Sequence, residues 1–227
     1  MIKKSNKALV LLSGGLDSTV VLSICKKEGY EVHAISFNYG QRHLIELEFA
    51  KYQANFFKCL SHRIFNIEFF GGSALTDDIS VPENRTVEEI PKEIPITYVP
   101  GRNIIFLSYS AGYAEYNGIE NIFIGVNSID YSGYPDCRKE FIEDFERMVN
   151  KSTKKGLTGK KFKIHTPLIN LTKKEIIILG SENGVDFSNT SSCYNPDSKK
   201  SCGVCDSCLL RIQGFNEAGL KDPKIKF

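Results

Sequence analysis

Short apolar runs alternate with longer amphipathic segments along the first part of the chain. Residues 7–12 (KALVLL) and 31–39 (EVHAISFNY) have the nearly continuous hydrophobicity of strands buried on both faces. Residues 18–30 and 42–58 instead repeat apolar residues at helical spacing, and residues 62–70 suit a third strand. Strands that alternate with helices predict a parallel sheet joined by right-handed crossovers.

The middle of the chain interrupts this alternation before it resumes. Residues 71–100 hold four prolines and six acidic residues, which favours an irregular insertion that forms a lid or rim. Beyond it we expect a helix at 102–118, a strand at 121–127, a helix at 139–150, a Lys-rich solvated loop at 151–161, a strand at 162–166 and a helix at 172–184. The pattern predicts a doubly wound, open, Rossmann-like α/β domain over residues 1–185.

Composition fits an ordinary globular protein and excludes several classes. The 227 residues are 41% hydrophobic and 25% charged, and the net charge of +2 gives no general basic surface, so nothing indicates nucleic-acid or membrane binding. Lys3, Lys4 and Lys7 precede the first apolar run as in a secretory signal, but Gly14-Gly15 and Asp17 interrupt that run. We therefore expect a soluble, unprocessed cytoplasmic protein.

A dense polar loop, Ser13-Gly-Gly-Leu-Asp-Ser-Thr19, separates the first strand from the first helix. Ligands of open parallel sheets bind beyond the carboxyl ends of the strands, where this loop lies. Its glycines allow close backbone approach, and its hydroxyl groups stand at a helix N-terminus that favours anions, so we expect phosphate there. The alternative, a tight turn capped by Asp17 or Ser18, needs fewer polar residues.

Residues 99–103 (VPGRN) supply a second candidate anchor at the same edge. Gly101 leads into the helix at 102–118, and Arg102 offers a forked, charged donor to a phosphate or carboxylate. A Pro-Gly turn with a solvated arginine is the alternative, and the neighbouring phosphate loop favours the anchor.

Four of the seven cysteines crowd into the segment from 193 to 208. Cys193, Cys202, Cys205 and Cys208 suit tetrahedral zinc, which would stabilise a small appendage at 186–227 in a structural rather than catalytic role. An iron–sulfur cluster is the main rival, although no Cys-Pro follows, and four unligated thiols are improbable at this density. Cys25, Cys59 and Cys137 are scattered, which is typical of a protein from a reducing compartment.

The loop sequence SGGLDS matches the pyrophosphate loop of the N-type ATP pyrophosphatase family, which includes GMP, NAD and asparagine synthetases. The resemblance implies an adenine nucleotide alpha-hydrolase-like fold and adenylation, in which a substrate oxygen attacks the α-phosphorus of ATP and pyrophosphate leaves. It implies Mg²⁺, with Asp17 as a possible ligand, and catalytic roles for Ser13, Asp17 and Ser18. The expected ATP-binding residues are Leu12, Ser13, Gly14, Gly15, Leu16, Asp17, Ser18, Thr19, Gly101, Arg102 and Asn103.

Five motifs together, SGGLDS, FNYGQRH, VPGRN, GVNSIDYSGYPDCR and the four-cysteine tail, resemble the 7-cyano-7-deazaguanine synthase family in their order. The resemblance implies a zinc-containing, homodimeric ligase that converts 7-carboxy-7-deazaguanine, ammonia and ATP to the nitrile for queuosine biosynthesis. The loop after strand 121–127 offers carboxylates, aromatic rings and a guanidinium for a guanine-like ring, the alternative being a solvated polar loop. We expect substrate contacts from Gln41, Arg42, Asp130, Tyr131, Asp136 and Arg138.

Two other functions remain open at this stage. A tRNA-modifying sulfurtransferase can share a pyrophosphate loop and cysteines, but we expect it to need a broader basic face. A non-enzymatic zinc-ribbon module is the second alternative. Cys137 has no histidine near it in sequence and is assigned a contact or packing role, whereas His43, beside Gln41 and Arg42, is the histidine expected near a site.

Overall fold

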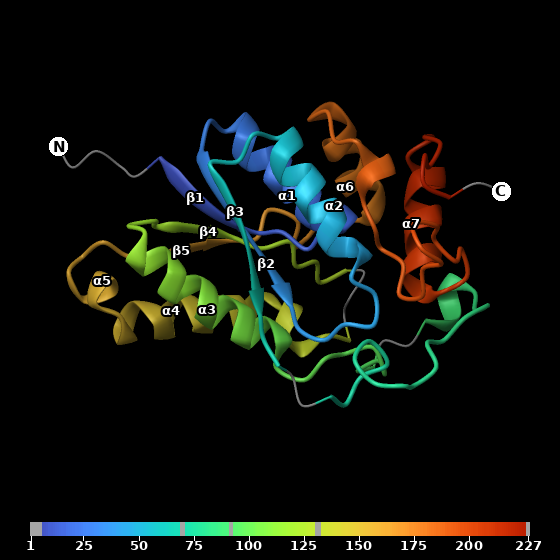
Figure 1. Cartoon of the computed structure of the whole chain (residues 1–227), viewed down its shortest axis with the longest axis horizontal. Coiled ribbons are helices and arrows are strands. Elements are labelled where there is room, and N and C mark those ends of the chain that lie inside the picture. Colours follow the sequence, from blue (N-terminus) through green and yellow to red (C-terminus); the bar gives the residue numbers. More distant parts are fainter. Residues whose placement is uncertain (1–5, 69–70, 91–92, 130–132, 226–227) are drawn as a thin grey trace.

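Five parallel strands form one twisted sheet at the centre of the molecule (Figure 1). The structure, a computed structural model, describes residues 6–68, 71–90, 93–129 and 133–225. The strands are β1 (Lys7–Leu11), β2 (Glu31–Asn38), β3 (Ser61–Asn66), β4 (Asn121–Phe123) and β5 (Lys163–His165), in the order β3-β2-β1-β4-β5. Every neighbouring pair is parallel, which confirms the predicted α/β class.

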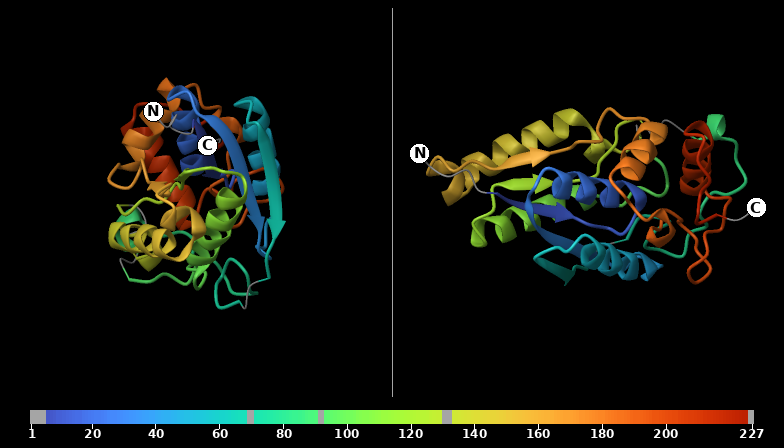
Figure 2. Two further views of the ribbon diagram at one scale, coloured as in Figure 1. Left: turned by 90° about the vertical axis from the view of Figure 1, so that its left-hand side faces the viewer. Right: turned by 90° about the horizontal axis from the view of Figure 1, so that it is seen from above.

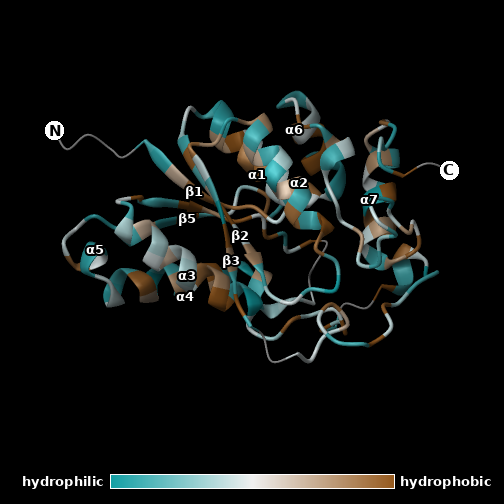
Figure 3. Ribbon diagram, in the orientation of Figure 1, coloured by the Kyte–Doolittle hydropathy of each residue, from teal (hydrophilic) through white to brown (hydrophobic). Residues whose placement is uncertain are grey.

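Helices cover both faces of the sheet (Figures 1 and 2). Side chains of β1 alternate between the faces, so Ala8 and Val10 pack into one hydrophobic core while Leu9 and Leu11 pack into the other. The first core is closed by α1 (Leu16–Lys27), α2 (Ile45–Phe56) and α6 (Lys173–Glu182), and the second by α3 (Arg102–Tyr116) and α4 (Lys139–Ser152). Hydrophobic stretches gather along the strands and the helix faces that meet them (Figure 3).

The strand order reverses direction between β1 and β4, and this position determines where a ligand can bind. β2 and β3 follow β1 on one side, whereas β4 and β5 lie on the other. The loops that leave β1 and β4 therefore diverge to opposite faces and open a crevice at the carboxyl edge of the sheet.

Two segments differ from the sequence prediction. β4 ends at Phe123 and not at residue 127, because residues 124–127 leave the sheet to line a cavity. The Lys-rich segment was expected to be a solvated loop, which is wrong for α5 (Lys154–Leu157), where Lys155 is buried with its ammonium 5.5 Å from the centre of the Phe162 ring. Within its described residues, the insertion at 71–100 is irregular as expected apart from one 3-10 turn, Val87–Glu89.

The C-terminal segment contains a helix that the sequence analysis did not predict, α7 (Asp206–Glu217), which packs beside α6. Its Phe215 enters the first core, with its ring 5.3 Å from that of Phe187. Arg211 is buried and donates to Asp222, Nε to Oδ2 at 2.7 Å, which ties the tail to the helix. Of the helices within the described residues, none is both long and apolar enough to cross a bilayer.

Candidate active site

A cavity of about 260 Å³ opens at the carboxyl edge of the sheet, at the crevice between β1 and β4. Its walls come from the loop after β1, the end of β2, the first turns of α2 and α3, the segment after β4, and residues 191–194. The volume lies just below the range of about 300–1,000 Å³ common for small-molecule pockets. The loop that the sequence predicts to bind phosphate lies on the wall of this cavity.

The loop from Ser13 to Ser18 is ordered by internal hydrogen bonds at the N-terminus of α1. Gly14 has φ of 85°, and a Cβ there would lie 2.0 Å from the backbone oxygen of Glu46, so this position requires glycine. The Ser18 hydroxyl accepts from the backbone N–H of Ser13 and lies 3.0 Å from the Ser13 hydroxyl. Backbone amides and hydroxyl groups at a helix start form a site for phosphate.

Asp17, predicted as a Mg²⁺ ligand, is held by a cation that the sequence analysis missed. Lys173, in the first turn of α6, donates to both carboxylate oxygens of Asp17 at 2.7 and 3.0 Å. The Lys173 side chain is 9% exposed and that of Asp17 is 16% exposed, so little water screens this pair. Removing either partner would leave an uncompensated charge in a poorly hydrated place.

The second predicted anchor lies at the start of α3, on the wall of the same cavity. Gly101 adopts a left-handed backbone with φ of 68°, which turns the chain into the helix, and Arg102 and Asn103 line the cavity. Asp136 accepts from the backbone N–H of Asn103 at 3.0 Å and is buried. Asp136 therefore fixes the start of α3 with one of its carboxylate oxygens, and it does not line the cavity.

Gln41 and Arg42 both reach the cavity wall, where their polar atoms have partners within the protein. The Gln41 side-chain oxygen accepts from the backbone N–H of Tyr39 at 2.8 Å, and its amide nitrogen donates to Glu46 Oε1 at 3.0 Å. Arg42 donates to the Ile79 carbonyl at 2.9 Å and so holds the insertion against the rim. Gln41 thus orients Glu46, a residue absent from the sequence-based set.

The predicted site residues other than Cys202, Cys205 and Cys208 divide into three groups in the structure. The cavity brings together Leu12, Ser13, Gly15, Leu16, Asp17, Ser18, Gln41, Arg42, Arg102, Asn103 and Cys193. Away from its lining lie Gly14, Thr19, Gly101, Asp136 and the exposed Arg138. Asp130 and Tyr131 fall outside the described residues.

Several cavity residues were missed by the sequence analysis. They are Phe37, Tyr39, Glu46, Phe106, Asn127, Ser191, Ser192, Tyr194 and Ser207. Glu46 had a readable signal, since it is a carboxylate at helical spacing with Ala50 and Ala54 on the apolar face of α2. The residues from 191 to 194 had none, because their position depends on how the C-terminal segment folds back against the phosphate loop.

Cys137 and His43 also line the cavity, with different chemical properties. Burial raises the pKa of the Cys137 thiol to about 12, so it is protonated at neutral pH and a poor nucleophile. His43 Nε2 is buried and has no hydrogen-bond partner among the described residues. A polar atom left in that state is a contact point for a ligand or water.

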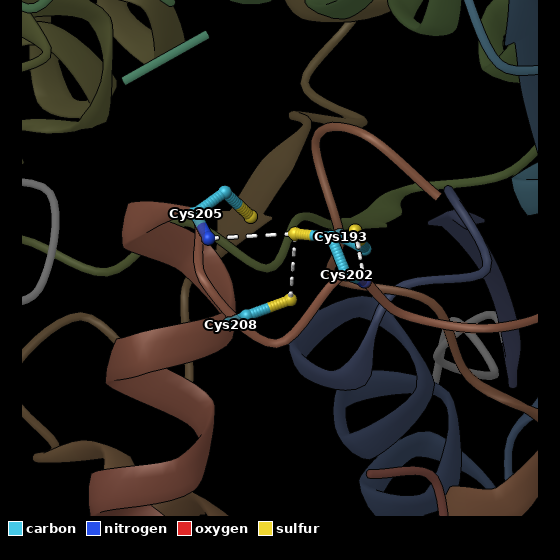
Figure 4. A group of neighbouring side chains, drawn as sticks. All are labelled: Cys193, Cys202, Cys205 and Cys208. Atoms are coloured by element: carbon cyan, nitrogen blue, oxygen red, sulfur yellow. Dashed lines mark hydrogen bonds between the residues drawn. The ribbon is translucent and has the colours of Figure 1, made fainter. Parts of the chain in front are cut away.

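The four C-terminal cysteines converge on one point (Figure 4). All four Sγ atoms lie within 4.8 Å of one another, close to the spacing of about 3.8 Å that a tetrahedron with 2.3 Å metal–sulfur bonds requires. The seven cysteines are free thiols. The donor set therefore fits a closed, four-coordinate metal site.

Backbone amides support thiolates at this cluster. The N–H groups of Cys202 and Asn195 point at Cys193 Sγ from 3.2 and 3.4 Å, and Cys205 N–H points at Cys202 Sγ from 3.4 Å. Hydrogen bonds from the Cys193 and Cys208 thiols lower the pKa of Cys205. Donors aimed at sulfur favour the deprotonated form that binds metal ions.

The cysteine cluster is joined to both the cavity and the insertion. Cys193 lies between Ser192 and Tyr194 on the cavity wall, and Ser191 N–H donates to the Gly14 carbonyl at 3.0 Å. On the other side, Glu83 pairs with Cys205 through an antiparallel bridge. The cluster therefore connects the insertion, the cavity wall and the phosphate loop.

Comparisons with known proteins agree on one family. Residues 7–219 match the family model for the queuosine biosynthesis protein QueC. The chain is 57% identical over 217 residues to a 7-cyano-7-deazaguanine synthase of Acetivibrio thermocellus, covering 95% of this chain and 96% of the relative. It is 54% identical over 224 residues to the 7-cyano-7-deazaguanine synthase of Desulfatibacillum aliphaticivorans, covering 97% and 96%.

A solved structure supports the fold. The NMN synthetase of Francisella tularensis superposes with a TM-score of 0.51 at 16% identity, over 96% of this chain and 74% of that one. At this identity the likeness shows shared architecture alone.

The environment of Glu46 predicts a pH-dependent stability difference. Burial raises the pKa of this carboxyl from its ordinary 4.5 to about 7, although the Arg102 charge and the Gln41 hydrogen bond favour ionisation. The folded protein thus binds this proton more tightly than the unfolded chain, so the stabilisation is full below pH 4.5 and is lost as the pH rises through 7. Replacing Glu46 by Gln should remove this loss, giving a relative gain on the order of 3 kcal/mol by about pH 8.

Urea unfolding of wild type and Glu46→Gln between about pH 5 and pH 8 measures the effect. Glu48→Gln, an exposed carboxylate on the same helix, serves as the control and should track wild type at every pH. Parallel curves for wild type and Glu46→Gln would contradict the raised pKa.

Proposed function

The chain belongs to the queuosine biosynthesis protein QueC family, and on that premise we propose that it converts 7-carboxy-7-deazaguanine and ammonia to 7-cyano-7-deazaguanine at the expense of ATP. The family resemblance expected from the sequence motifs is thus confirmed. The observation that carries the ATP-dependent chemistry is the preorganised loop from Ser13 to Ser18 at the N-terminus of α1, on the wall of the one cavity that also holds Asp17 and Arg102.

Conversion of a carboxylate to a nitrile requires both oxygens to leave, and each needs activation. In the first stage a carboxylate oxygen attacks the α-phosphorus of ATP and pyrophosphate departs. Ammonia then displaces AMP and loses a proton, which gives the primary amide. In the second stage the amide oxygen attacks another ATP, and loss of AMP with the two remaining N–H protons leaves the nitrile. The balance is two AMP and two pyrophosphate per nitrile.

The chemistry of each cavity residue suggests which part of ATP or of the substrate it would bind. The loop amides and the Ser13 and Ser18 hydroxyl groups suit the pyrophosphate leaving group, which carries the charge that a helix N-terminus stabilises. Arg102 and Asn103 approach from the start of α3 and suit the remaining phosphate or the substrate carboxylate. Mg²⁺ would neutralise phosphate charge, with Asp17 as its candidate ligand.

The metal, the assembly and the compartment also belong to this proposal. Zinc is the ion that best fits four cysteine sulfurs in a closed site, where it would stabilise the cavity wall at 191–194 without binding water. The family resemblance supports a homodimer, and the free thiols suit the cytoplasm. The division into a main domain at 1–185 and an appendage at 186–227 remains a prediction, as do the roles of the individual site residues.

Asp17→Asn should abolish ATP-dependent pyrophosphate release, because the substitution removes the carboxylate from the phosphate loop while keeping its shape. It also leaves the Lys173 ammonium unpaired, so we expect a stability loss of about 1–3 kcal/mol. Pyrophosphate release and urea unfolding are measured on the same preparation. Asp144→Asn, an exposed carboxylate on α4, is the matched control. Near-normal turnover in a folded Asp17→Asn protein would remove the loop from the mechanism.

The purified protein should contain one zinc ion per chain, and Cys205→Ser should lose it together with thermal stability, since one missing thiolate opens a closed site. Metal analysis by mass spectrometry and thermal melting test both parts. Cys59→Ser, a half-buried thiol outside the cluster, should keep the metal. Iron with inorganic sulfide, or a stable protein without metal, would contradict the zinc assignment.

The two-stage scheme predicts that the synthetic amide is itself a substrate. Supplied with ATP and no ammonia, it should yield the nitrile with one AMP per product, whereas the acid with ammonia should consume two ATP. Mass spectrometry of the product and chromatography of the nucleotides measure these ratios. Conversion of the acid without conversion of the amide would exclude the free amide as an intermediate. ADP and phosphate as products would contradict the assignment of the SGGLDS loop.

A further inference from the structure

One carboxylate on the cavity wall has no task in the chemistry described above. Glu46 comes from the first turn of α2, and its Oε1 accepts from the Gln41 amide at 3.0 Å. Gln41 is itself fixed, because its oxygen accepts from the Tyr39 backbone N–H at 2.8 Å. Among the described residues, Glu46 Oε2 has no hydrogen-bond partner. The side chain is thus oriented at one oxygen and available at the other.

Aromatic rings surround this part of the cavity. Phe37 stacks on Phe106 with ring centres 4.2 Å apart and planes 12° from parallel, and Tyr39 meets Phe106 edge to face at 5.5 Å. Tyr134 closes the same wall and shares a 2.7 Å hydrogen bond with the Thr97 hydroxyl. Flat apolar walls of this kind suit a planar heterocycle, which can stack or pack by its edge.

A carboxylate in apolar surroundings binds best to a ligand that brings its own hydrogen-bond donors. The desolvation of Glu46 is only partly offset, by the Gln41 amide and by the charge of Arg102. A guanine-like ring presents two adjacent donors, its N1–H and its exocyclic amino group, whose spacing matches the two oxygens of one carboxylate. Such a ring could stack on the aromatic walls of the cavity and donate both hydrogen bonds to the Glu46 carboxylate.

The two other acidic candidates among the described residues near the cavity are already engaged elsewhere. Asp136 accepts from the Asn103 backbone N–H and does not line the cavity. Asp17 accepts two hydrogen bonds from Lys173 and lies in the phosphate loop, where an anion is expected. Among the described residues, Glu46 is therefore the carboxylate whose position suits the ring edge of the substrate.

We propose that Glu46 is the specificity-determining residue that accepts hydrogen bonds from the N1–H and the 2-amino group of the 7-deazaguanine ring. This inference rests on the proposed function, and it adds the residue that recognises the hydrogen-bond donors of the substrate ring. Arg102, whose guanidinium carbon lies 6.0 Å from the centre of the Tyr39 ring on the same wall, then remains available for phosphate or for the ring carboxylate.

Substrate pairs that differ by one donor test the assignment. Wild type, Glu46→Gln and the control Glu48→Gln are each given 7-carboxy-7-deazaguanine and its analogue with hydrogen in place of the 2-amino group, and kcat/KM for nitrile formation is measured. A site that accepts this donor should prefer the 2-amino substrate by about 100-fold or more, because the analogue leaves a half-buried acceptor unpaired. Glu48→Gln should keep that preference.

In Glu46→Gln, kcat/KM for the 2-amino substrate should fall about 100-fold. The reason is that the amide NH2 of the glutamine, a donor, would face the N–H donors of the ring where the carboxylate accepted from them. The analogue should change less than about 5-fold, and the KM for ATP should stay within about 2-fold of wild type. A preserved preference, or an equal loss with both substrates, would overturn the recognition role. Nitrile formation by wild type tests the proposed function on its own. The role of Glu46 is tested by the ratio of kcat/KM between the two substrates, which can be measured only if wild type is active.

A binding measurement without ATP makes the result independent of catalysis. Isothermal calorimetry with the nitrile product should show the same pattern, with affinity for wild type about 100-fold above that for Glu46→Gln. Glu46→Asp, which keeps the charge and withdraws it by one methylene, should fall between the two. Thermal melts verify that each variant is folded. Equal affinities across folded variants would overturn the proposal even if all three remained active.

Discussion

The parallel sheet imposes the constraint on which the site depends. All five strands run in the same direction, so their carboxyl ends meet at one edge, and the reversal of strand order between β1 and β4 opens that edge. The phosphate loop follows β1, Glu46 follows β2, and residues 124–127 follow β4. Groups that lie over 100 residues apart in sequence reach one cavity because of that shared polarity. A single antiparallel strand at the centre would send its following loop to the opposite edge.

The C-terminal segment closes one wall of the cavity that the sheet and its loops leave open. Residues 191–194 form a wall that rests on the phosphate loop through the Ser191 to Gly14 hydrogen bond, while Cys205 pairs with Glu83 of the insertion. The same segment contains the buried Arg211 to Asp222 pair and the four sulfurs around one centre. Because Cys193 belongs both to this wall and to the cluster, the cysteine cluster and the geometry of the cavity are physically linked.

Much of this arrangement was readable from the sequence, and the limits have physical causes. Apolar periodicity predicted the strands and most helices because buried strands and amphipathic helices leave local patterns. SGGLDS predicted a phosphate loop, and the structure places that segment on the cavity wall. Lys173 could not be predicted as the partner of Asp17, since 156 residues separate them and only the packing of α6 beside α1 joins them. The same holds for residues 191–194. Glu46 did leave a signal, because it is a carboxylate on the apolar face of a predicted helix.

Among the described residues, the two acidic side chains that line the cavity both have hydrogen-bond partners within the protein. A ligand that displaces such a partner must supply an interaction of similar strength. Asp17 has an ammonium at 2.7 Å, a strong partner, whereas Glu46 has one neutral amide and a more distant guanidinium. A cation or phosphate arriving at Asp17 therefore has to redistribute an existing ion pair, while a neutral ring with two N–H donors arriving at Glu46 supplies hydrogen bonds that the free protein lacks. The difference favours charge exchange at the phosphate loop and recognition of a neutral donor edge at α2. The two carboxylates on the cavity wall therefore favour ligands of different chemistry, which is what the proposed function requires of a site for a nucleotide and a flat ring.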